Sequence, residues 1–465
     1  MPSHRLLAAA LLPPLALLSA PAHSQATTSI PDRTCSILDE GAEGSRIWAQ
    51  LTHYDTRAFQ AAIDRCAAAG GGTVEVPKGE WMIGPIYLKS NIRLNIAKGA
   101  EVLGGTDPAL FGEPNADGER IGLINIADAE NVEVAGEGLI DGQGAVWWER
   151  MRALWRSDPR FATDGQARQK FPDRRPRLVR VSNSRNVALR GVTFANSPSF
   201  HLVIADSEYV TVERARITAP THGPNTDAID PTRSRRILIT DNFISVGDDA
   251  VAIKSGNPDP RHPDAISADI TVRGNMIHAS RGICIGSQTN GGVTRVLVEN
   301  NEFVGSMYGF RIKTARERGG EISDITFRNN RMTDVDVPLV FSGYYAYRPM
   351  DRREAERQVE PTGFILGNQI WPGEDDPARA FVHDKTPRIT GVTVDGLAAT
   401  GAEWAGIATG LPESPIDRLV LRNVKVEADK GFLLRHATVE GTPGMFAVTA
   451  GPPMIVQRNG RLQQP

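Results

Sequence analysis

A strand-like pattern that recurs along this chain limits its possible folds more than any other feature. Nine segments, such as NVALRGVTFAN and RILITDNFISV, alternate apolar and polar residues around an Asn, Gly or Asp. Alternation with a period of two predicts strands with one buried face. The first apolar residues of the nine segments are Val132, Val187, Val210, Ile237, Ile270, Val296, Ile325, Val392 and Leu419. They follow one another at 55, 23, 27, 33, 26, 29, 67 and 27 residues, so the two long gaps span two repeats each or carry insertions.

Strand repeats of this length predict a solenoid whose rungs stack on one shared core. No helical pattern of about 10–15 residues lies between the strands, so βαβ units are not expected. A propeller or a sandwich would need hairpin turns at a more regular spacing. The repeat therefore predicts an all-β chain folded as a parallel β-helix.

The N-terminal end of such a stack needs a cap. Residues 55–70 (DTRAFQAAIDRCAAAG) place apolar residues at i, i+3, i+4 and i+7 from Phe59, which predicts an amphipathic helix. Gly70–Gly72 are expected to end this helix. We expect the helix to cover the first rung.

Residues 25–465 are expected to form one β-helix domain. Two charged segments, near 143–178 and 348–384, interrupt the repeat, and both are predicted to be long loops. Loops on a rigid scaffold often carry binding surfaces.

The first residues, MPSHRLLAAALLPPLALLSAPAHSQA, combine a basic start, a Pro-interrupted apolar run and small residues at its end. Residues 1–24 are therefore predicted to be a signal peptide, which would send the protein to the periplasm or the medium. No later run of about 18 apolar residues follows, and the formal net charge is only −3. Neither a membrane nor a nucleic acid is an expected partner. A single chain with capped ends is expected to be a monomer.

The chain has three cysteines. Cys35 and Cys66 both lie in the N-terminal region and could pair in an exported protein. The interpretation we favour is that Cys66 and Cys284 are small buried apolar residues. The cysteine spacing matches no metal site, and neither a metal nor another cofactor is predicted.

Three carboxylates form the strongest candidate site. Asp227 lies in THGPNTDAIDPT, and Asp248 and Asp249 lie in SVGDDAVAIKSG, with Asp248 21 positions after Asp227. Residues one repeat apart sit on adjacent rungs, whose strands are about 4.8 Å apart. Crowded carboxylates raise one another's pKa, so one can act as acid and another as base at a glycosidic bond.

Cations follow the carboxylates in the next two repeats. Arg281 comes 32 residues after Asp249, and Arg311 and Lys313 follow 30 residues later in the segment YGFRIKT. Arg311 and Lys313 are i and i+2 on a predicted strand, so both point to the same side. Each motif alone is common in turns or exposed strands. Their spacing over successive repeats predicts a site for an acidic sugar, because guanidinium groups bind carboxylates well.

These motifs resemble glycoside hydrolase family 28, the polygalacturonases and their relatives. The resemblance rests on the segments PNTDAID (224–230), VGDDAVAIKSG (246–256), IGS (285–287) and GFRIKT (309–314), in that order. It extends to AFQAAIDRCAAAGGGTVEVPKGEW, IDGQGAVWW and NSPSFHL, and so spans most of the chain after residue 25. It implies a single-stranded right-handed parallel β-helix, a pectin-lyase-like solenoid.

The resemblance also implies an activity, the hydrolysis of α-linked galacturonic acid in pectin or oligogalacturonides with inversion. By matching motifs, Asp248 is similar to the general acid of the family. Asp227 and Asp249 are similar to the pair that activates the attacking water. The two insertions would favour exo action if they walled off one end of the cleft.

Substrate-binding residues are implied in the same way. Arg311 and Lys313 are similar to the residues that grip the galacturonate carboxylate. Asn225 would orient Asp227. Tyr344 lies where the family often has a substrate-contacting tyrosine, and its neighbour Tyr345 is an alternative.

One position departs from the family pattern. Where the family usually has Gly-His-Gly or Ser-His-Gly before the IGS segment, this chain has Ser280-Arg281-Gly282. Arginine stays charged at every working pH. We expect Arg281 to lower the pKa of Asp248 and weaken it as a proton donor, or to bind a second acidic group of the substrate.

Two other functions compete with the hydrolase. A β-helix polysaccharide lyase would use the three aspartates to hold Ca²⁺. A pectin-binding homologue would keep the solenoid with weakened catalysis, and Arg281 is the reason to consider it.

Overall fold

The computed structural model describes residues 26–44, 53–113, 120–157, 175–257, 264–345 and 377–464. The predicted signal peptide and residues 346–376 of the second insertion lie outside these ranges. Within them, no helix has both the length and the apolar composition required to cross a bilayer.

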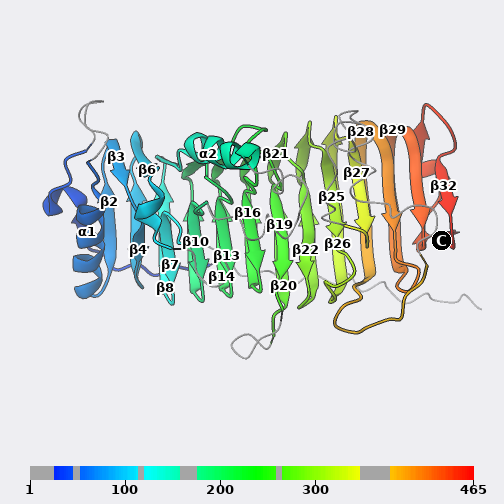
Figure 1. Cartoon of the computed structure of the whole chain (residues 1–465), viewed down its shortest axis with the longest axis horizontal. Helices are drawn as coiled ribbons and strands as arrows, with labels where there is room; N and C mark the ends of the chain where they lie inside the picture. The colour runs from blue at the N-terminus through cyan, green and yellow to red at the C-terminus, as the bar shows by residue number, and fades with distance from the viewer. Residues whose placement is uncertain are drawn as a thin grey trace, which may run out of the picture.

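The strands form one continuous parallel ladder that winds as a right-handed β-helix, with the rungs side by side along the long axis of the molecule (Figure 1). Each rung contributes a strand to each of three faces, because a strand pairs with the third strand after it over most of the chain. The parallel β-helix predicted from the repeat is therefore confirmed.

The first face is built from β1 (Thr34–Ser36), β2 (Gly72–Val76), β5 (Ile92–Ile96), β8 (Glu130–Gly136), β11 (Arg185–Arg190), β14 (Glu208–Glu213), β17 (Arg235–Thr240), β20 (Ser267–Arg273), β23 (Val293–Glu299), β30 (Ala437–Glu440) and β33 (Arg461–Gln463). The second face is built from β3 (Gly79–Ile83), β6 (Ala100–Gly104), β9 (Leu139–Asp141), β12 (Thr193–Ala195), β15 (Arg216–Thr218), β18 (Phe243–Ser245), β21 (Met276–His278), β24 (Glu302–Val304) and β31 (Phe446–Val448).

The third face is built from β4 (Ile86–Leu88), β7 (Ile124–Ala127), β10 (Val179–Ser182), β13 (Leu202–Ala205), β16 (Ile229–Thr232), β19 (Val251–Ser255), β22 (Ile283–Thr289), β25 (Tyr308–Lys313), β27 (Val337–Ser342) and β32 (Met454–Gln457). Three long strands continue around the bends from one face to the next: β26 (Glu321–Thr333), β28 (Arg388–Thr409) and β29 (Ile416–Arg435). Short 3-10 turns occur at Ile37–Glu40, Pro108–Phe111 and Pro443–Met445.

The nine apolar residues of the sequence repeat form one stack on the first face. Each is paired with the next one along the chain, from Val132 with Val187 to Val392 with Leu419. All nine are buried, and each contributes about 1.5–3 kcal/mol by burial. Because Val132 pairs directly with Val187, and Ile325 with Val392, the two long gaps carry insertions and not extra rungs.

A ladder of buried amides supports the bend between the first and second faces. Asn242, Asn275 and Asn301 each donate from Nδ2 to the Oδ1 of the next amide in the ladder, which ends at Asn330, at 2.9–3.0 Å. Each Oδ1 also accepts a backbone N–H of the preceding rung. Buried polar groups are stable only when paired in this way, so the Asn positions of the repeat fix where the chain turns.

The predicted capping helix is present as α1 (Thr56–Ala68) at the N-terminal end of the stack (Figure 1). Phe59 and Ile63 are fully buried on its inner side. Cys66 on α1 forms a disulfide with Cys35 on β1, so our preference for an unpaired Cys66 was wrong. Spacing alone could not decide this point, since pairing requires two Cα atoms at disulfide distance.

The first insertion is not simply a loop, as we had predicted from its charge. Residues Gly144–Ser157 form α2, which lies along the edge of the third face over β10 to β16 (Figure 1). Trp147, Trp148 and Met151 are buried against the rungs. Three large apolar side chains within two helical turns supply the contact area that stabilises a helix, and the charged residues around them concealed this pattern.

Candidate active site

Four of the candidate residues lie just before three successive strands of the third face: Asp227 before β16, Asp248 and Asp249 before β19, and Arg281 before β22. Arg311 and Lys313 lie on the next strand, β25. Ile229 pairs with Val251, and Val251 pairs with Ile283. Asp227, Asp249 and Arg281 each precede one of these paired residues by two positions, and their backbone segments are hydrogen-bonded from rung to rung. The 32-residue offset from Asp249 to Arg281 is therefore the true register.

The register on the next rung differs from the one we expected. Ile283 pairs with Phe310, so Tyr308 stands opposite Arg281. Arg311 and Lys313 pair with Cys284 and Gly286, further along the strand. Phe310 and Ile312 face the core, so the alternation does place Arg311 and Lys313 together on the outer side.

The three carboxylates converge. One oxygen from each of Asp227, Asp248 and Asp249 lies within 4.8 Å of the others. All three residues are buried. A group of anions so close and so shielded from water requires cations beside it.

Asp249 is the most completely paired of the three. Its Oδ1 accepts from Arg311 Nη2 at 2.8 Å, and its Oδ2 accepts from Lys313 Nζ at 2.5 Å and from Cys284 Sγ at 3.1 Å. Burial alone would raise the pKa of Asp249, but Lys313 and Arg311 outweigh it and hold the pKa well below its usual range. Asp249 is therefore a permanent anion, a poor base and a strong electrostatic anchor.

Asp248 occupies a more open position. Its Oδ1 accepts the backbone N–H of Asp249 at 3.0 Å and lies 3.4 Å from Arg281 Nη1. Burial and the Asp227 carboxylate raise the pKa of Asp248 to about 6, against the lowering by Arg281. Arg281 does lower this pKa, as we had expected, but burial and the neighbouring anion outweigh the guanidinium, so the net shift is upward.

Asp227 is held by Lys254, which also contacts Asp230. Lys254 Nζ lies 3.4 Å from Asp227 Oδ2 and 3.1 Å from Asp230 Oδ1. Asp227 Oδ1 is buried and has no hydrogen-bond partner among the described residues. Burial and Asp230 raise the pKa of Asp227 to about 7, and Lys254 only partly offsets them.

Sequence reasoning missed Lys254 and Asp230. Both lie inside motifs that we quoted, VAIKSG and NTDAID. The signal was alternation: Ile229 and Ile253 face the core, so Asp230 and Lys254 face outward on paired strands. That placed them beside Asp227 on the same face.

The four cations of the site differ in their access to a ligand. The exposed fraction of the side chain is 38% for Arg281, 12% for Lys254, 7% for Lys313 and 1% for Arg311. A substrate carboxylate approaching from solvent therefore meets Arg281 first. Arg311 can influence a substrate mainly through Asp249.

Asn225 is positioned by the first insertion. Its side-chain oxygen accepts from Arg175 Nη2 at 2.8 Å, while Arg175 Nη1 donates to the carbonyls of Pro198 and Pro224. Trp148 on α2 donates to the same Pro198 carbonyl. Asn225 also adopts a left-handed backbone conformation with φ of 54°, which Asn tolerates better than most residues. The insertion thus fixes the turn that carries Asp227.

The two tyrosines take different positions. The Tyr344 ring is buried and lies 5.7 Å from the Arg316 guanidinium. The Tyr345 ring lies 5.4 Å from Lys313 Nζ, at the edge of the carboxylate cluster. Tyr345, the alternative at the sequence level, is the better placed of the two to meet a substrate.

Three clustered aspartates could in principle hold a metal ion. Here Lys254, Arg281, Arg311 and Lys313 each lie within 3.4 Å of one of them. Their positive charge already balances the anions and would repel a divalent cation. The residues present therefore fit an acid–base site better than a calcium site.

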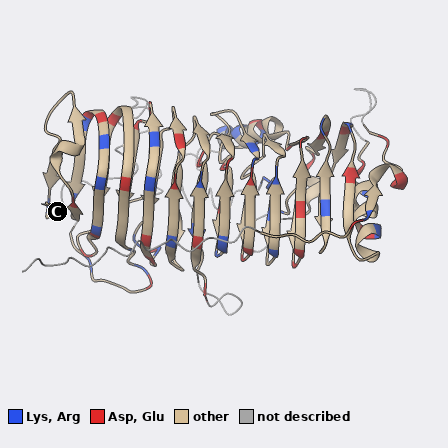
Figure 2. Cartoon of the chain, turned by 180° about the vertical axis from the view of Figure 1, so that it is seen from behind, with Lys and Arg blue, Asp and Glu red and all other residues tan. Residues whose placement is uncertain are grey.

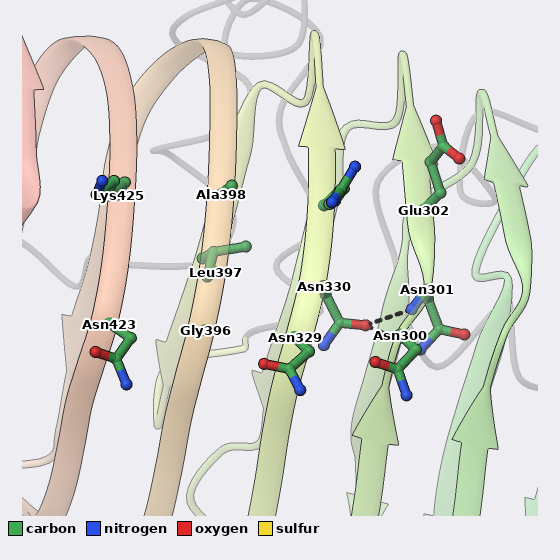
Figure 3. A pocket seen from close by; sticks show the side chains of 11 residues that line it. Asn300, Asn301, Glu302, Asn329, Asn330, Gly396, Leu397, Ala398, Asn423 and Lys425 are labelled. Carbon is green, nitrogen blue, oxygen red and sulfur yellow. Dashed lines mark hydrogen bonds between the residues drawn. The ribbon is translucent and has the colours of Figure 1, made fainter.

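A hollow on the surface lies away from the three carboxylates, on β24, β26, β28 and β29 near the Asn ladder (Figure 3). Gly396 and Ala398 leave a gap there between longer side chains of the neighbouring rungs. None of the predicted site residues lines it.

The sequence matches the family model described as Glycosyl hydrolases family 28 over residues 66–356. An endo-polygalacturonase of Pectobacterium carotovorum subsp. carotovorum is 30% identical over 303 residues, which cover 62% of this chain and 72% of that protein. A probable polygalacturonase of Vitis vinifera is 26% identical over 394 residues, which cover 80% of this chain and 71% of that protein.

Solved structures are similar over almost the whole chain. The crystal structure of a hyperthermoactive exopolygalacturonase from Thermotoga maritima has a TM-score of 0.66 and 26% identity, and covers 94% of this chain and 92% of its own. A family 28 exopolygalacturonase of Yersinia enterocolitica has a TM-score of 0.73 and 19% identity, covering 93% and 78%. The second likeness supports the fold alone.

Proposed function

This chain belongs to glycosyl hydrolases family 28, and from that premise we propose that it hydrolyses α-linked galacturonic acid in pectin or oligogalacturonides with inversion of configuration. The observation that carries the proposal is the group of three buried carboxylates with separated pKa values. Carboxylates whose pKa values are driven apart can divide the roles of acid and base.

The roles follow from the environments. Asp248 donates its proton to the leaving oxygen. Because the pKa of Asp248 is about 6 and that of Asp227 is about 7, the reactive form, with Asp248 protonated and Asp227 ionised, is a minority form that is most populated between these two pH values. Asp227 accepts a proton from the attacking water through Oδ1, which has no hydrogen-bond partner among the described residues. Asp249 stays ionised and helps to hold that water and to stabilise the positive charge that develops on the sugar.

Substrate recognition is divided between two kinds of cation. Arg281 is the most exposed and binds the galacturonate carboxylate directly. Lys313 and Arg311 act mainly by keeping Asp249 ionised, and Lys313 with Tyr345 borders the sugar. Asn225 orients Asp227 by fixing its turn.

The family resemblance implies inversion of configuration. The carboxylates of this site, however, lie closer together than is typical of inverting enzymes. Inverting pairs are typically about 6.5–9.5 Å apart and retaining pairs about 5–5.5 Å. The nearest oxygens here lie within 4.8 Å. Retention through a covalent intermediate is therefore the alternative that the experiment must separate.

We also propose exo action. The helix α2 lies along the edge of the third face over β10 to β16 (Figure 1), on the N-terminal side of Asp248 and Asp249, where it would wall off one end of the substrate site. The exopolygalacturonase structure with 26% identity covers 94% of this chain.

The deciding experiment is incubation of the protein with oligogalacturonides of defined length, with and without a chelator. Reducing ends, near-ultraviolet absorbance and product lengths would be followed together, and the first anomer formed would be read by NMR. We expect new reducing ends without absorbance, monomer or dimer released from one end, and the β-anomer first.

Other outcomes identify the alternatives. Absorbing products that disappear with chelator would assign a lyase. The α-anomer first would assign retention. Binding without any product would identify a pectin-binding homologue.

We further propose that residues 1–24 are removed on export to the periplasm or the medium and that the mature protein is a monomer. The N-terminal sequence of the secreted protein and its mass in solution test both points.

A further inference from the structure

Behind the three carboxylates lies a buried ion pair that the proposed reaction does not use directly. Asp230 on β16 and Lys254 on β19 both face outward from the sheet, yet the side chain of Asp230 is 2% exposed and that of Lys254 is 12% exposed. The Lys254 ammonium also lies 4.1 Å from the centre of the Phe200 ring. Together with the contact to Asp227, three contacts therefore hold the Lys254 ammonium in place: those with Asp227, Asp230 and the Phe200 ring.

We propose that Lys254 and Asp230 are positioning residues for Asp227: the Lys254 ammonium fixes one oxygen of the Asp227 carboxylate, and Asp230 balances the charge of that ammonium, so that the second oxygen stays free to take a proton from the attacking water. This rests on the proposed role of Asp227 as the base.

The geometry supports an oriented carboxylate. Lys254 engages Asp227 Oδ2, while Oδ1 is buried without a partner among the described residues. Leaving a buried carboxylate oxygen unpaired is unfavourable unless a ligand completes it. The carboxylate is close to Asp248 and Asp249, so that ligand would lie inside the catalytic cluster.

The charges explain why Asp230 is needed. A lone ammonium beside Asp227 would stabilise its anion and make it a weak base. Asp230 shares the ammonium at the shorter distance, 3.1 Å against 3.4 Å. Burial and Asp230 together raise the pKa of Asp227 to about 7, so the carboxylate stays basic enough to accept a proton near neutral pH.

Other charged or titratable groups also lie near Asp227, Asp230 and Lys254 and act on the pKa of Asp227. The charged groups are Asp248 and Asp249 before β19, Lys313 on β25 and Arg177 before β10, and the neutral buried ring of His201 before β13 contacts the Asp227 carbonyl. All of them remain in the variants below, so a shift between variants reports on Lys254 and Asp230.

The test compares two variants that should move the pH optimum in opposite directions. Asp230→Asn removes an anion, lowers the pKa of Asp227 and should move the optimum of kcat/KM on oligogalacturonides to lower pH. Lys254→Met removes a cation, raises that pKa and should move the optimum to higher pH, with kcat reduced at least about tenfold. Lys254→Arg should restore most of the rate and the optimum.

A matched control is available on β29. Like Lys254, Lys430 combines an ion pair with an aromatic contact, but it pairs with a single carboxylate, Glu403, at 3.1 Å and lies 5.0 Å from the Trp404 ring. Lys430→Met should leave the optimum unchanged. Loss of activity in Asp230→Asn and Lys254→Met at an unchanged optimum would overturn the proposal, because a purely structural role predicts that result.

A second readout needs no turnover. The loss of Tm caused by Lys254→Met at pH 8 should be smaller when Asp227 is already Asn, since the two anions left by Lys254→Met then no longer repel each other. Equal losses in both backgrounds would show that Lys254 does not hold Asp227. If the wild-type protein releases no product, the proposed function is wrong. The comparison of the two Tm losses still decides whether Lys254 contacts Asp227.

Discussion

Two groups of charged side chains that point outward from the strands, one on the first face and one on the third, can be compared directly. On the first face, Glu133 accepts from Arg93 at 2.6 Å and from Arg190 at 3.1 Å, and Glu213 pairs with Arg190 at 2.7 Å and with Arg214 at 3.0 Å. Opposite charges alternate from rung to rung. On the third face, three carboxylates crowd within 4.8 Å.

The difference lies in what each carboxylate has for neighbours. Glu133 and Glu213 each have two guanidinium groups within hydrogen-bonding distance. Asp249 also has two cations, but Asp248 has one and Asp227 shares one with Asp230. On the first face each carboxylate lies between opposite charges, whereas on the third face crowding and burial raise the pKa values of Asp227 and Asp248, so that these carboxylates hold protons near neutral pH.

The comparison separates charged residues that stabilise the fold from charged residues that are proposed to take part in catalysis. Figure 2 shows the molecule from behind, where basic and acidic residues are scattered singly along the rungs. Such charges can be paired across strands at little cost. The cluster of three carboxylates exists only because four cations on three rungs compensate it.

The largest expected effect is on catalysis. Asp248→Asn keeps the shape of the side chain but cannot supply an acidic proton, so kcat should fall by about 10²–10⁴-fold. Steady-state kinetics on trigalacturonate measures it, with the far-ultraviolet circular dichroism and Tm as checks on folding. A variant that keeps more than a tenth of the wild-type rate would remove Asp248 from the role of acid.

The same kind of substitution on the first face should act on stability instead. Glu133→Gln leaves Arg93 and Arg190 with a neutral partner and should cost about 1–3 kcal/mol of the free energy of unfolding. The two guanidinium groups are partly exposed, which favours the lower end of that range. Urea denaturation measures the loss, and kcat should be unchanged. A loss of rate in the folded variant would break the division between the two clusters.

A smaller effect is expected at the border of the catalytic cluster. In Arg281→His, the imidazole is neutral above pH 7 and no longer lowers the pKa of Asp248, so the alkaline limb of the kcat profile should move to higher pH. KM should rise about tenfold, because a charged hydrogen bond to the substrate is lost. The pH–rate profile and KM are measured together. An unchanged profile would show that Arg281 does not act on the acid.

No effect is expected from removal of divalent metal. The three carboxylates are already compensated by four cations, so EDTA should leave both the rate and the Tm unchanged. Loss of activity on chelation, restored by Ca²⁺ alone, would contradict the acid–base site and support the lyase alternative.

Much of the fold follows from local patterns. The nine repeat residues predicted one stack, and every successive pair of them is in register, because alternating apolar residues can bury only one face. The capping helix was predicted from its period. The helix α2 was missed, because its buried tryptophans lie among charged residues and its stability comes from the rungs beneath it.

The candidate site shows the same division between sequence and structure. Local motifs brought Asp227, Asp248, Asp249 and Arg281 to one face, since each motif precedes a strand of the same stack. The partners of these residues were not readable from the motifs: Arg311 is committed to Asp249, and Lys254 to Asp227 and Asp230.

What the sequence by itself determined is therefore the repeat, the outward direction of each side chain and the set of residues on the catalytic face. Only the tertiary structure decided which of them touch. Successive rungs of the site are offset by 22, 32 and 27 residues, because turns of different length join strands of constant spacing. Contacts across rungs depend on these offsets and on how deeply each side chain is buried, and neither is encoded in a motif of a few residues.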